Sequence, residues 1–263
     1  MRARSSRLAF AVVLFVAGSA RAQEIRVAAA ADLRFALSEL AVNYEQQSGT
    51  KVNVTYGSSG NFFAQIRNGA PFDLFFSADL DYPRKLEAAG LAEAGTLYEY
   101  ALGRIVIWTR RDAPIDVATQ GWNALLSPSV QKIAIANPAL APYGRAAVAA
   151  LEKAGILEKV KSKFVYGENI SQAAQFVQFG NAQAGIVGLS LALSPAMKGG
   201  KRWEIPAAMH PPIEQGVILL RSARNKAQAR AFLEFVKSAD ARATFERFGF
   251  MTPKANAASA EKP

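Results

Sequence analysis

Four short segments place small, hydroxyl-bearing or proline residues where a strand is expected to give way to a helix. Their sequences are AAD at 30–32, GSSG at 57–60, APYG at 141–144 and NIS at 169–171. The first turn of a helix has backbone N–H groups without intrahelical acceptors, and the helix dipole adds partial positive charge there. Such a junction can therefore hold an anion without a cationic side chain. In the GSSG segment, the glycines allow close approach to a ligand and the serine hydroxyls can donate further hydrogen bonds.

Each of these signals is weak when it is taken alone. A GSSG turn is more often a plain loop whose serine caps the next helix, and an APYG turn is usually only a turn. The four junctions occur together in a chain without a convincing catalytic group. This coincidence favours an anion-binding site over an enzyme active site.

The composition excludes several kinds of chemistry. The 263 residues include one His and no Cys, which rules out disulfides, zinc clusters, iron–sulfur sites, thiol nucleophiles and multi-histidine metal sites. A Ser-His-Asp triad would have to use His210, which lies in a turn-like MHPP segment. The net charge is +10, but the basic residues are dispersed and no nucleic-acid motif is present. We therefore expect a solubilising surface and no nucleic-acid partner.

Several other chemically capable residues favour structural roles. Asp73 lies in a buried-strand pattern, and Asp79 and Asp81 are typical of a loop and a helix cap, so no metal ion is expected there. Arg145 follows the APYG turn and is expected to face solvent rather than a ligand. The three tryptophans are expected to pack against apolar neighbours.

The four junctions are positioned by an alternation of short apolar runs and amphipathic stretches, which is typical of an α/β protein. Strands are expected at 25–31, 51–56, 72–77, 103–109, 132–136, 163–166, 184–189 and 216–221. Helices are expected from 33 until the stop at 48–49, and at 61–68, 81–89, 146–154, 170–180, 226–237 and 240–248, with a helix-like segment at 121–130. The long strands at 103–109 and 216–221 bracket the middle of the chain. This arrangement predicts two α/β lobes joined by two crossing segments, with a ligand cleft between the lobes.

The N-terminus has the pattern of a cleaved secretory signal. Three arginines precede an apolar run at 8–17, and the sequence ARA at 20–22 supplies the small residues of a cleavage site. The run of 10 residues is shorter than the roughly 20 that a membrane span needs. We therefore expect a signal peptide at 1–22, a first lobe formed by 23–102 with 217–253, a second lobe at 103–216 and a flexible tail at 254–263.

Four longer segments resemble the periplasmic molybdate-binding proteins of ABC importers, which have the type II periplasmic-binding fold. They are IRVAAAADLRFAL at 25–37, VTYGSSGNFFAQIRNGAPFDLFFSAD at 54–79, IANPALAPYGRAA at 135–147 and ARATFERFGFMTP at 241–253. The resemblance extends from Glu24 to about Pro253, and the second segment is its most specific part. It implies two lobes, each a mixed sheet flanked by helices, joined by two crossing hinge segments.

The resemblance also implies which residues form the site. An oxyanion would be held at Ala31 and Asp32 after the first strand, at Ser59 with Ser58 beside it, and at the backbone amides of Tyr143 and Ile170. Some members of the family add a tyrosine hydroxyl after the AGIV strand. This chain has Gly188 and Leu189 there, so that donor is absent.

Asp32 departs from the family pattern. Many members have Ser or Asn at this position, and both can donate, whereas an ionised Asp only accepts hydrogen bonds and repels a dianion. In one interpretation the carboxylate turns away to cap the helix that begins at Leu33, and only the backbone amide faces the ligand. In the other, the site is retuned toward a protonated, less charged or different ligand.

The expected function is therefore that of a monomeric periplasmic receptor. It captures molybdate, and tungstate as well, through neutral N–H and O–H donors and delivers it to the membrane permease of an ABC importer, without a cofactor or enzymatic activity. Two alternatives stay open. One is a receptor for another oxyanion or a small organic acid, and the other is a secreted serine hydrolase that uses Ser58 or Ser59.

Overall fold

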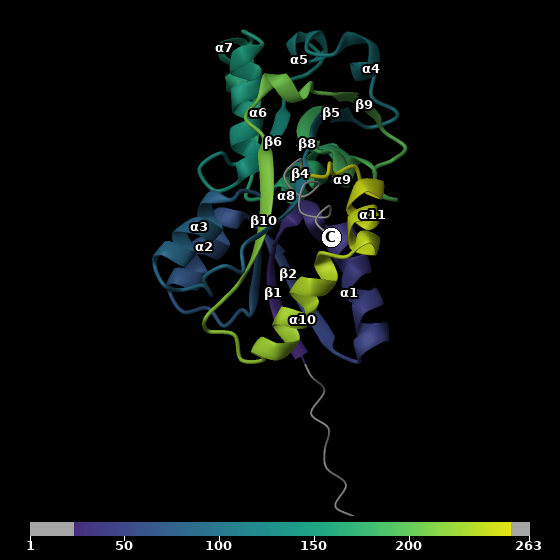
Figure 1. Cartoon of the computed structure of the whole chain (residues 1–263). Helices are drawn as coiled ribbons and strands as arrows, with labels where there is room; N and C mark the ends of the chain where they lie inside the picture. The colour runs from purple at the N-terminus through teal and green to yellow at the C-terminus, as the bar shows by residue number, and fades with distance from the viewer. Residues whose placement is uncertain (1–23, 254–263) are drawn as a thin grey trace, which may run out of the picture.

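The computed structural model describes residues 24–253, which form two α/β lobes, one above the other in Figure 1. Each lobe is built on a mixed five-stranded sheet, as expected. The predicted signal peptide at 1–22 and the predicted tail at 254–263 lie outside the described residues. Within 24–253, no helix is both long and apolar enough to cross a membrane.

The first sheet has the strand order β2-β1-β3-β10-β4. Its strands are β1 (Glu24–Ala30), β2 (Lys51–Gly57), β3 (Leu74–Ser77), β4 (Tyr98–Gly103) and β10 (Ile213–Leu219). Strand β1 pairs in parallel with β2 and β3, whereas β10 runs antiparallel to both β3 and β4. A strand from the end of the chain therefore completes the sheet begun by the N-terminal strands.

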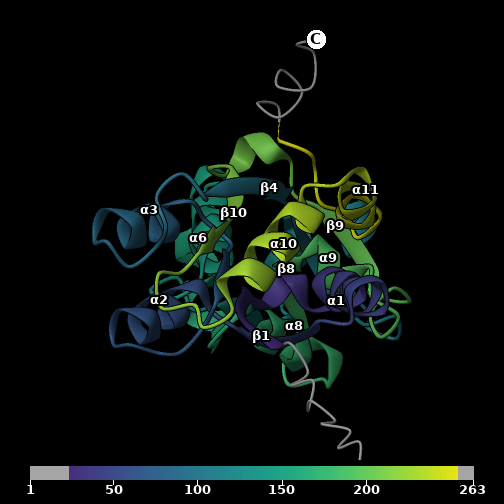
Figure 2. The same cartoon turned by 60° about the horizontal axis from the view of Figure 1, so that its bottom comes forward.

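Helices cover both faces of this sheet, because successive side chains of a buried strand point to opposite faces. Phe76 of β3 packs with α1 (Arg34–Ser48), α10 (Lys226–Val236) and α11 (Ala239–Arg247). Its neighbour Phe75 packs on the opposite side with α2 (Ser59–Arg67) and α3 (Asp81–Ala88). Figure 2 shows α2 and α3 on one side of the sheet and α1 and α11 on the other.

The second sheet has the strand order β7-β6-β8-β5-β9. Its strands are β5 (Ile105–Thr109), β6 (Ile133–Ala136), β7 (Phe164–Gly167), β8 (Ala184–Gly188) and β9 (Lys201–Glu204). The helices of this lobe are α4 (Val117–Gln120), α5 (Asn123–Leu126), α6 (Pro142–Lys153), α7 (Leu157–Val160), α8 (Ile170–Gln178) and α9 (Leu189–Ala192). The short 3-10 helices are η1 (Ala31–Leu33), η2 (Lys161–Lys163) and η3 (Ala207–Met209).

The two edge strands β4 and β9 were not expected as separate strands. Their sequences, YEYALG and KRWE, mix polar with apolar residues and contain no continuous apolar run. The strand expected at 103–109 is in fact divided at Arg104, where the chain passes from the first sheet to the second. Strand β10 begins at Ile213, so the return crossing lies between β9 and β10, earlier in the chain than the expected lobe boundary at 216/217.

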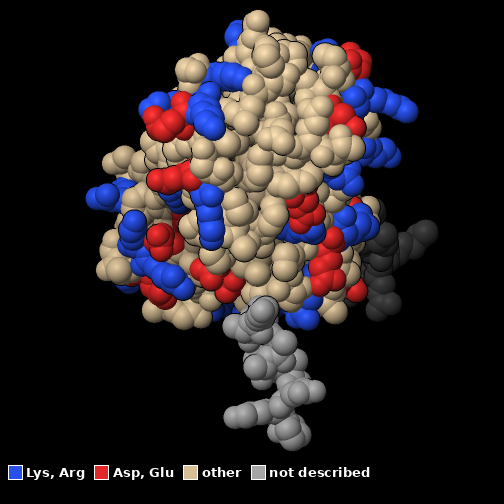
Figure 3. All heavy atoms as spheres, turned by 90° about the horizontal axis from the view of Figure 1, so that it is seen from above, with Lys and Arg blue, Asp and Glu red and all other residues tan. Residues whose placement is uncertain are grey.

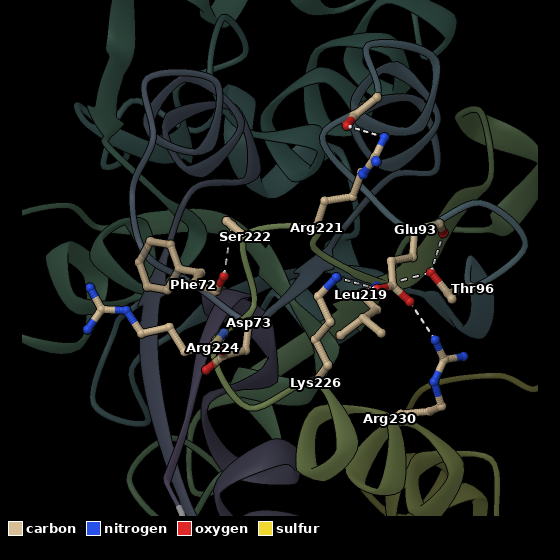
Figure 4. Close-up of polar contacts among 11 residues, drawn as sticks. Phe72, Asp73, Glu93, Thr96, Leu219, Arg221, Ser222, Arg224, Lys226 and Arg230 are labelled. Atoms are coloured by element: carbon tan, nitrogen blue, oxygen red, sulfur yellow. Dashed lines mark hydrogen bonds and ion pairs between the residues drawn. The ribbon is translucent and has the colours of Figure 1, made fainter.

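Asp73 joins three parts of the first lobe through its carboxylate. This side chain is buried, and its Oδ2 accepts a hydrogen bond from the Arg26 amide while its Oδ1 accepts one from the Arg224 amide, both at 2.7 Å. Figure 4 shows this loop before α10, where Glu93 also pairs with Lys226 and Arg230. Asp73 therefore has the structural role that the buried-strand pattern indicated.

Replacement of Asp73 by Ala is expected to destabilise the protein by about 3 kcal/mol, because the backbone amides of Arg26 and Arg224 lose a charged acceptor. Urea denaturation of Asp73→Ala measures this loss. Asp112→Ala is the control, because Asp112 is exposed and pairs only with nearby Arg110 on the surface, where such a pair contributes about 0–1 kcal/mol. Equal stability of the two variants would contradict the anchoring role.

Candidate anion-binding site between the lobes

All six residues that the sequence indicated line one small cavity between the two lobes. The first lobe contributes Ala31 and Asp32 after β1, with Ser58 and Ser59 at the start of α2. The second lobe contributes Tyr143 at the start of α6 and Ile170 at the start of α8. The structure therefore brings together segments that are far apart in the sequence.

Three helix starts converge on this cavity. The helices α2, α6 and α8 begin at Ser59, Pro142 and Ile170. The amides of Ser59, Tyr143 and Ile170 lie in these first turns, which have no intrahelical acceptors. Their N–H groups and the three helix dipoles make the cavity favourable for an anion.

The two serines of the GSSG turn have different roles. The Ser58 hydroxyl accepts a hydrogen bond from the Asn61 amide at 3.3 Å and so caps α2. The Ser59 oxygen accepts one from the Ala78 amide at 3.0 Å. Because its oxygen already accepts this bond, the Ser59 hydroxyl proton is available to a further acceptor in the cavity. The same holds for Ser58, whose oxygen also accepts one backbone hydrogen bond, so both hydroxyl protons are available to a ligand.

Asp32 does not cap the helix that follows it, so the capping interpretation is wrong. Among the described residues, no amide of the turn that follows makes a hydrogen bond of ordinary length and angle to its carboxylate. The Asp32 Oδ2 atom instead accepts hydrogen bonds from the Tyr143 hydroxyl at 2.9 Å and from the Gln215 Nε2 at 2.6 Å. The backbone amides of Asp32 and Leu33 also act to lower the pKa of this carboxylate, but its hydrogen bonds of ordinary geometry come from the two long-range donors.

A chain of hydrogen bonds extends from Asp32 into the first sheet. Besides its bond to Asp32, the Gln215 Nε2 donates to the Tyr143 oxygen at 2.9 Å. The Gln215 Oε1 accepts a bond from the Tyr100 hydroxyl at 2.7 Å. Gln215 lies on β10, next to a crossing segment, and is fully buried. Sequence reasoning missed it, and its only signal was a polar residue directly before an apolar strand.

Burial controls the ionisation of this cluster. Removal from water raises the pKa of Asp32 from 3.8 to about 6, although the hydrogen bonds from Gln215 and Tyr143 act to lower it. Burial also raises the pKa of Tyr143 and that of Tyr100 well above their ordinary values, so both remain protonated. The cluster therefore contains one group that titrates near neutral pH.

The two lobes make direct contacts around the cavity. The Gly60 amide donates to the Leu140 carbonyl at 2.9 Å, and the main-chain carbonyls of Ala31 and Asp32 accept bonds from the hydroxyls of Ser171 and Ser190 in the second lobe. In addition, Arg145, which was expected to face solvent, pairs across the cleft with Asp79 at 2.5 Å, although it remains partly exposed. The structure therefore represents the lobes in a closed arrangement.

A serine hydrolase finds no support in this arrangement. The described residues that line the cavity include no His or Lys. His210 lines a different cavity, with Met251 and Pro212, and its Nδ1 lies 2.8 Å from the Pro211 carbonyl. Neither Ser58 nor Ser59 therefore has the imidazole that a Ser-His-Asp arrangement requires.

Residues 25–251 match the family model described as bacterial extracellular solute-binding protein. The chain belongs to this family of solute-binding proteins. The solute-binding protein is 38% identical to the molybdate-binding protein ModA of Azotobacter vinelandii. The matched region has 237 residues and covers 89% of this chain and 92% of the relative. It is 35% identical to ModA of Rhodobacter capsulatus, over 95% of this chain and 96% of the relative.

A solved structure supports the same relationship for this solute-binding protein. The periplasmic molybdate-binding protein of Azotobacter vinelandii superimposes with a TM-score of 0.82 and 34% identity, over 88% of this chain and 100% of that one. The two mixed sheets flanked by helices therefore form the periplasmic-binding fold that the sequence resemblance implied.

Proposed function

We propose that the protein captures molybdate, and tungstate as well, in the cavity between its lobes and delivers it to the permease of an ABC importer. The observation that carries this proposal is the convergence of three helix starts and the Ser59 hydroxyl on one cavity, in a chain that resembles molybdate-binding proteins over most of its length. Six residues form the proposed site: Ala31, Asp32, Ser58, Ser59, Tyr143 and Ile170.

The hydrogen-bond donors in this site are neutral, and the site therefore favours anions that only accept hydrogen bonds. The Ser59 hydroxyl and the first-turn amides can surround a tetrahedral oxyanion, and their partial charges act strongly in a cavity from which water is excluded. A site made of donors disfavours ligands that must themselves donate, because their hydrogens would remain unpaired.

The protein is expected to work in the periplasm and to deliver its ligand by closure of the two lobes. Residues 1–22 direct export to the periplasm, and the mature chain acts there as a monomer without catalytic activity or a cofactor. The lobes formed by 23–102 with 217–253 and by 103–216 move as bodies about the two crossing segments. Closure then buries the anion and presents one surface to the permease, which couples binding to delivery by a population shift.

Thermal unfolding with a panel of oxyanions tests this function. A ligand at about 100 times its dissociation constant adds roughly 2.7 kcal/mol of stability, which raises the midpoint by several degrees. We expect molybdate and tungstate to produce this shift, and sulfate, phosphate and nitrate to produce none.

A matched pair of variants links this shift to the cavity. Ser59→Ala removes the hydroxyl donor in the cavity and is expected to reduce the molybdate shift, whereas Ser129→Ala, which removes an exposed hydroxyl, leaves the shift unchanged. A flat response of the unmodified protein to molybdate, or a shift with phosphate alone, would overturn the proposed function.

A further inference from the structure

The direction of the hydrogen bonds around Asp32 determines where a proton on this side chain must reside. The Oδ2 atom accepts from two donors, the Tyr143 hydroxyl and the Gln215 amide nitrogen. The Gln215 side chain cannot reverse its orientation without losing the bond from Tyr100, because Tyr100 donates to its Oε1 atom. With both donors in place Oδ2 is fully engaged, so Oδ1 is the position left for a proton on the carboxyl group.

The Oδ1 atom has no protein partner. It is buried and makes no hydrogen bond to any described residue, although Asp32 as a whole is 0% exposed and lines the anion cavity. A buried carboxyl oxygen without a donor favours the neutral acid, and a neutral acid in turn requires an acceptor for its hydrogen. An oxygen of an anion in the cavity is such an acceptor.

Charge leads to the same conclusion. An ionised Asp32 beside a dianion would place like charges together in a medium of low dielectric, which is strongly unfavourable. Among the described residues that line the cavity, none has a cationic side chain that would offset this repulsion. Protonation removes the repulsion and adds a donor at the same time.

We propose that Asp32 binds the oxyanion as a neutral acid, taking up one proton from solvent as the anion enters and donating the Oδ1 hydrogen to an anion oxygen. This inference rests on the proposed anion site and makes Asp32 the residue that couples affinity to pH. No bond to the anion other than a hydrogen bond forms, and the proton returns to solvent when the anion leaves.

The uncharged groups that face Asp32 do not titrate in the same range. Tyr143 on α6 and Tyr100 on β4 have pKa values raised by burial, and the other side-chain donor is the amide of Gln215 on β10. From α8 and α9, the hydroxyls of Ser171 and Ser190 bond only main-chain carbonyls.

The charged side chains on neighbouring elements are exposed or act on one another. Arg34 at the start of α1 is exposed and lies over the Tyr56 ring of β2, 5.2 Å from its centroid. Arg145 on α6 pairs with Asp79. On β4, burial and then the nearby charge of Glu214 on β10 raise the pKa of Glu99. None of these charges is among the causes that act on the Asp32 pKa, which burial raises and the surrounding hydrogen bonds lower.

The expected pH dependence follows from linkage. In the closed arrangement without an anion the pKa of Asp32 is about 6, and an anion that binds the neutral form raises it further. Affinity then increases as the pH falls from above the bound pKa, and it levels off below the free pKa. We expect molybdate to bind roughly 30-fold more tightly at about pH 6 than at about pH 8.

Titration calorimetry of the unmodified protein at about pH 7 measures the proton directly. The observed heat of molybdate binding is compared in PIPES and in Tris, whose ionisation enthalpies differ, and the difference gives the number of protons taken up. We expect close to one proton per anion. This measurement requires no variant and is independent of any effect of mutation on folding.

Two acid-to-amide variants assign the proton. Asp32→Asn keeps an acceptor for Tyr143 and Gln215 and supplies a permanent N–H donor in place of the Oδ1 hydrogen. It is expected to bind molybdate without proton uptake and with no more pH dependence than the anion itself has. The control Glu168→Gln changes an exposed acid across the same cleft, which bonds Asn61 at 2.6 Å, and is expected to keep the unmodified proton uptake.

The calorimetric results distinguish the role of Asp32 from the proposed function of molybdate binding. Molybdate binding with no proton uptake by the unmodified protein, or equal uptake by Asp32→Asn, would overturn the role of Asp32 and leave the proposed function standing. Absence of molybdate binding by every variant at every pH would overturn both.

Discussion

Replacement of Gly60 by Ala is expected to weaken molybdate binding about 100-fold, equivalent to about 2.7 kcal/mol, while the ligand-free protein keeps its stability. A Cβ atom at Gly60 would lie 2.7 Å from the Leu140 carbonyl oxygen and 2.9 Å from the Tyr82 hydroxyl. Leu140 belongs to the second lobe and its oxygen is part of the main chain, so it cannot move without moving that lobe. The clash therefore opposes closure.

Titration calorimetry and urea denaturation of Gly60→Ala test this prediction. In an open arrangement the added methyl group meets only the Tyr82 hydroxyl of the first lobe, which is the end of a side chain that can turn away, so the unfolding free energy is expected to stay near that of the unmodified protein. Gly199→Ala is the matched control, because a Cβ there has no neighbour within 4 Å. Unchanged molybdate affinity in Gly60→Ala would show that binding does not require the closed contact between Gly60 and Leu140.

Replacement of Gly144 by Ala is expected to destabilise the second lobe by about 3 kcal/mol or more, as overpacking against fixed atoms does. In an ordinary helix this change would be favourable by about 1 kcal/mol. Here a Cβ would lie 2.2 Å from the Ala136 carbonyl oxygen and 2.8 Å from the Pro138 nitrogen, both main-chain atoms at the end of β6. The start of α6 would have to move away from the sheet, and the Tyr143 amide would leave the cavity with it.

Thermal unfolding and molybdate titration of Gly144→Ala measure both effects. The midpoint is expected to fall by several degrees, and molybdate affinity is expected to decrease because one of the converging helix starts is displaced. Gly199→Ala again provides the comparison. A Gly144→Ala protein with a raised midpoint would show that α6 packs less closely on β6 than the structure indicates.

Local sequence patterns were sufficient for the segments that line the cavity. The strand-to-helix junctions at Asp32, Ser59, Tyr143 and Ile170 were identified because turn residues interrupt apolar runs, and each junction is set by only a few neighbouring residues. The resemblance to molybdate-binding proteins then grouped them into one site. The fold class followed from the alternation of strands and helices, which is also a local property.

Partners distant in the sequence could not be predicted in the same way. The capping interpretation of Asp32 relied on its nearest amides, whereas its actual donors, Tyr143 and Gln215, are brought beside it by the packing of the two lobes. The edge strands β4 and β9 were missed because an edge strand needs no continuous apolar run and is defined by its pairing partner. In both cases the deciding interaction depends on tertiary contacts.

The position of β10 determines the order in which the lobes can fold. The strand lies between β3 and β4, although the whole second sheet separates it from them in the sequence. Residues 105–204 contain every strand of the second sheet, so that lobe can form while the first sheet still has unpaired edges at β3 and β4. Such long-range pairing is slow, and open edges are prone to aggregation. A chain that ends before Ile213 would therefore have all strands of the second sheet. Its first sheet would lack the central strand β10, and the unpaired edges of β3 and β4 would favour aggregation.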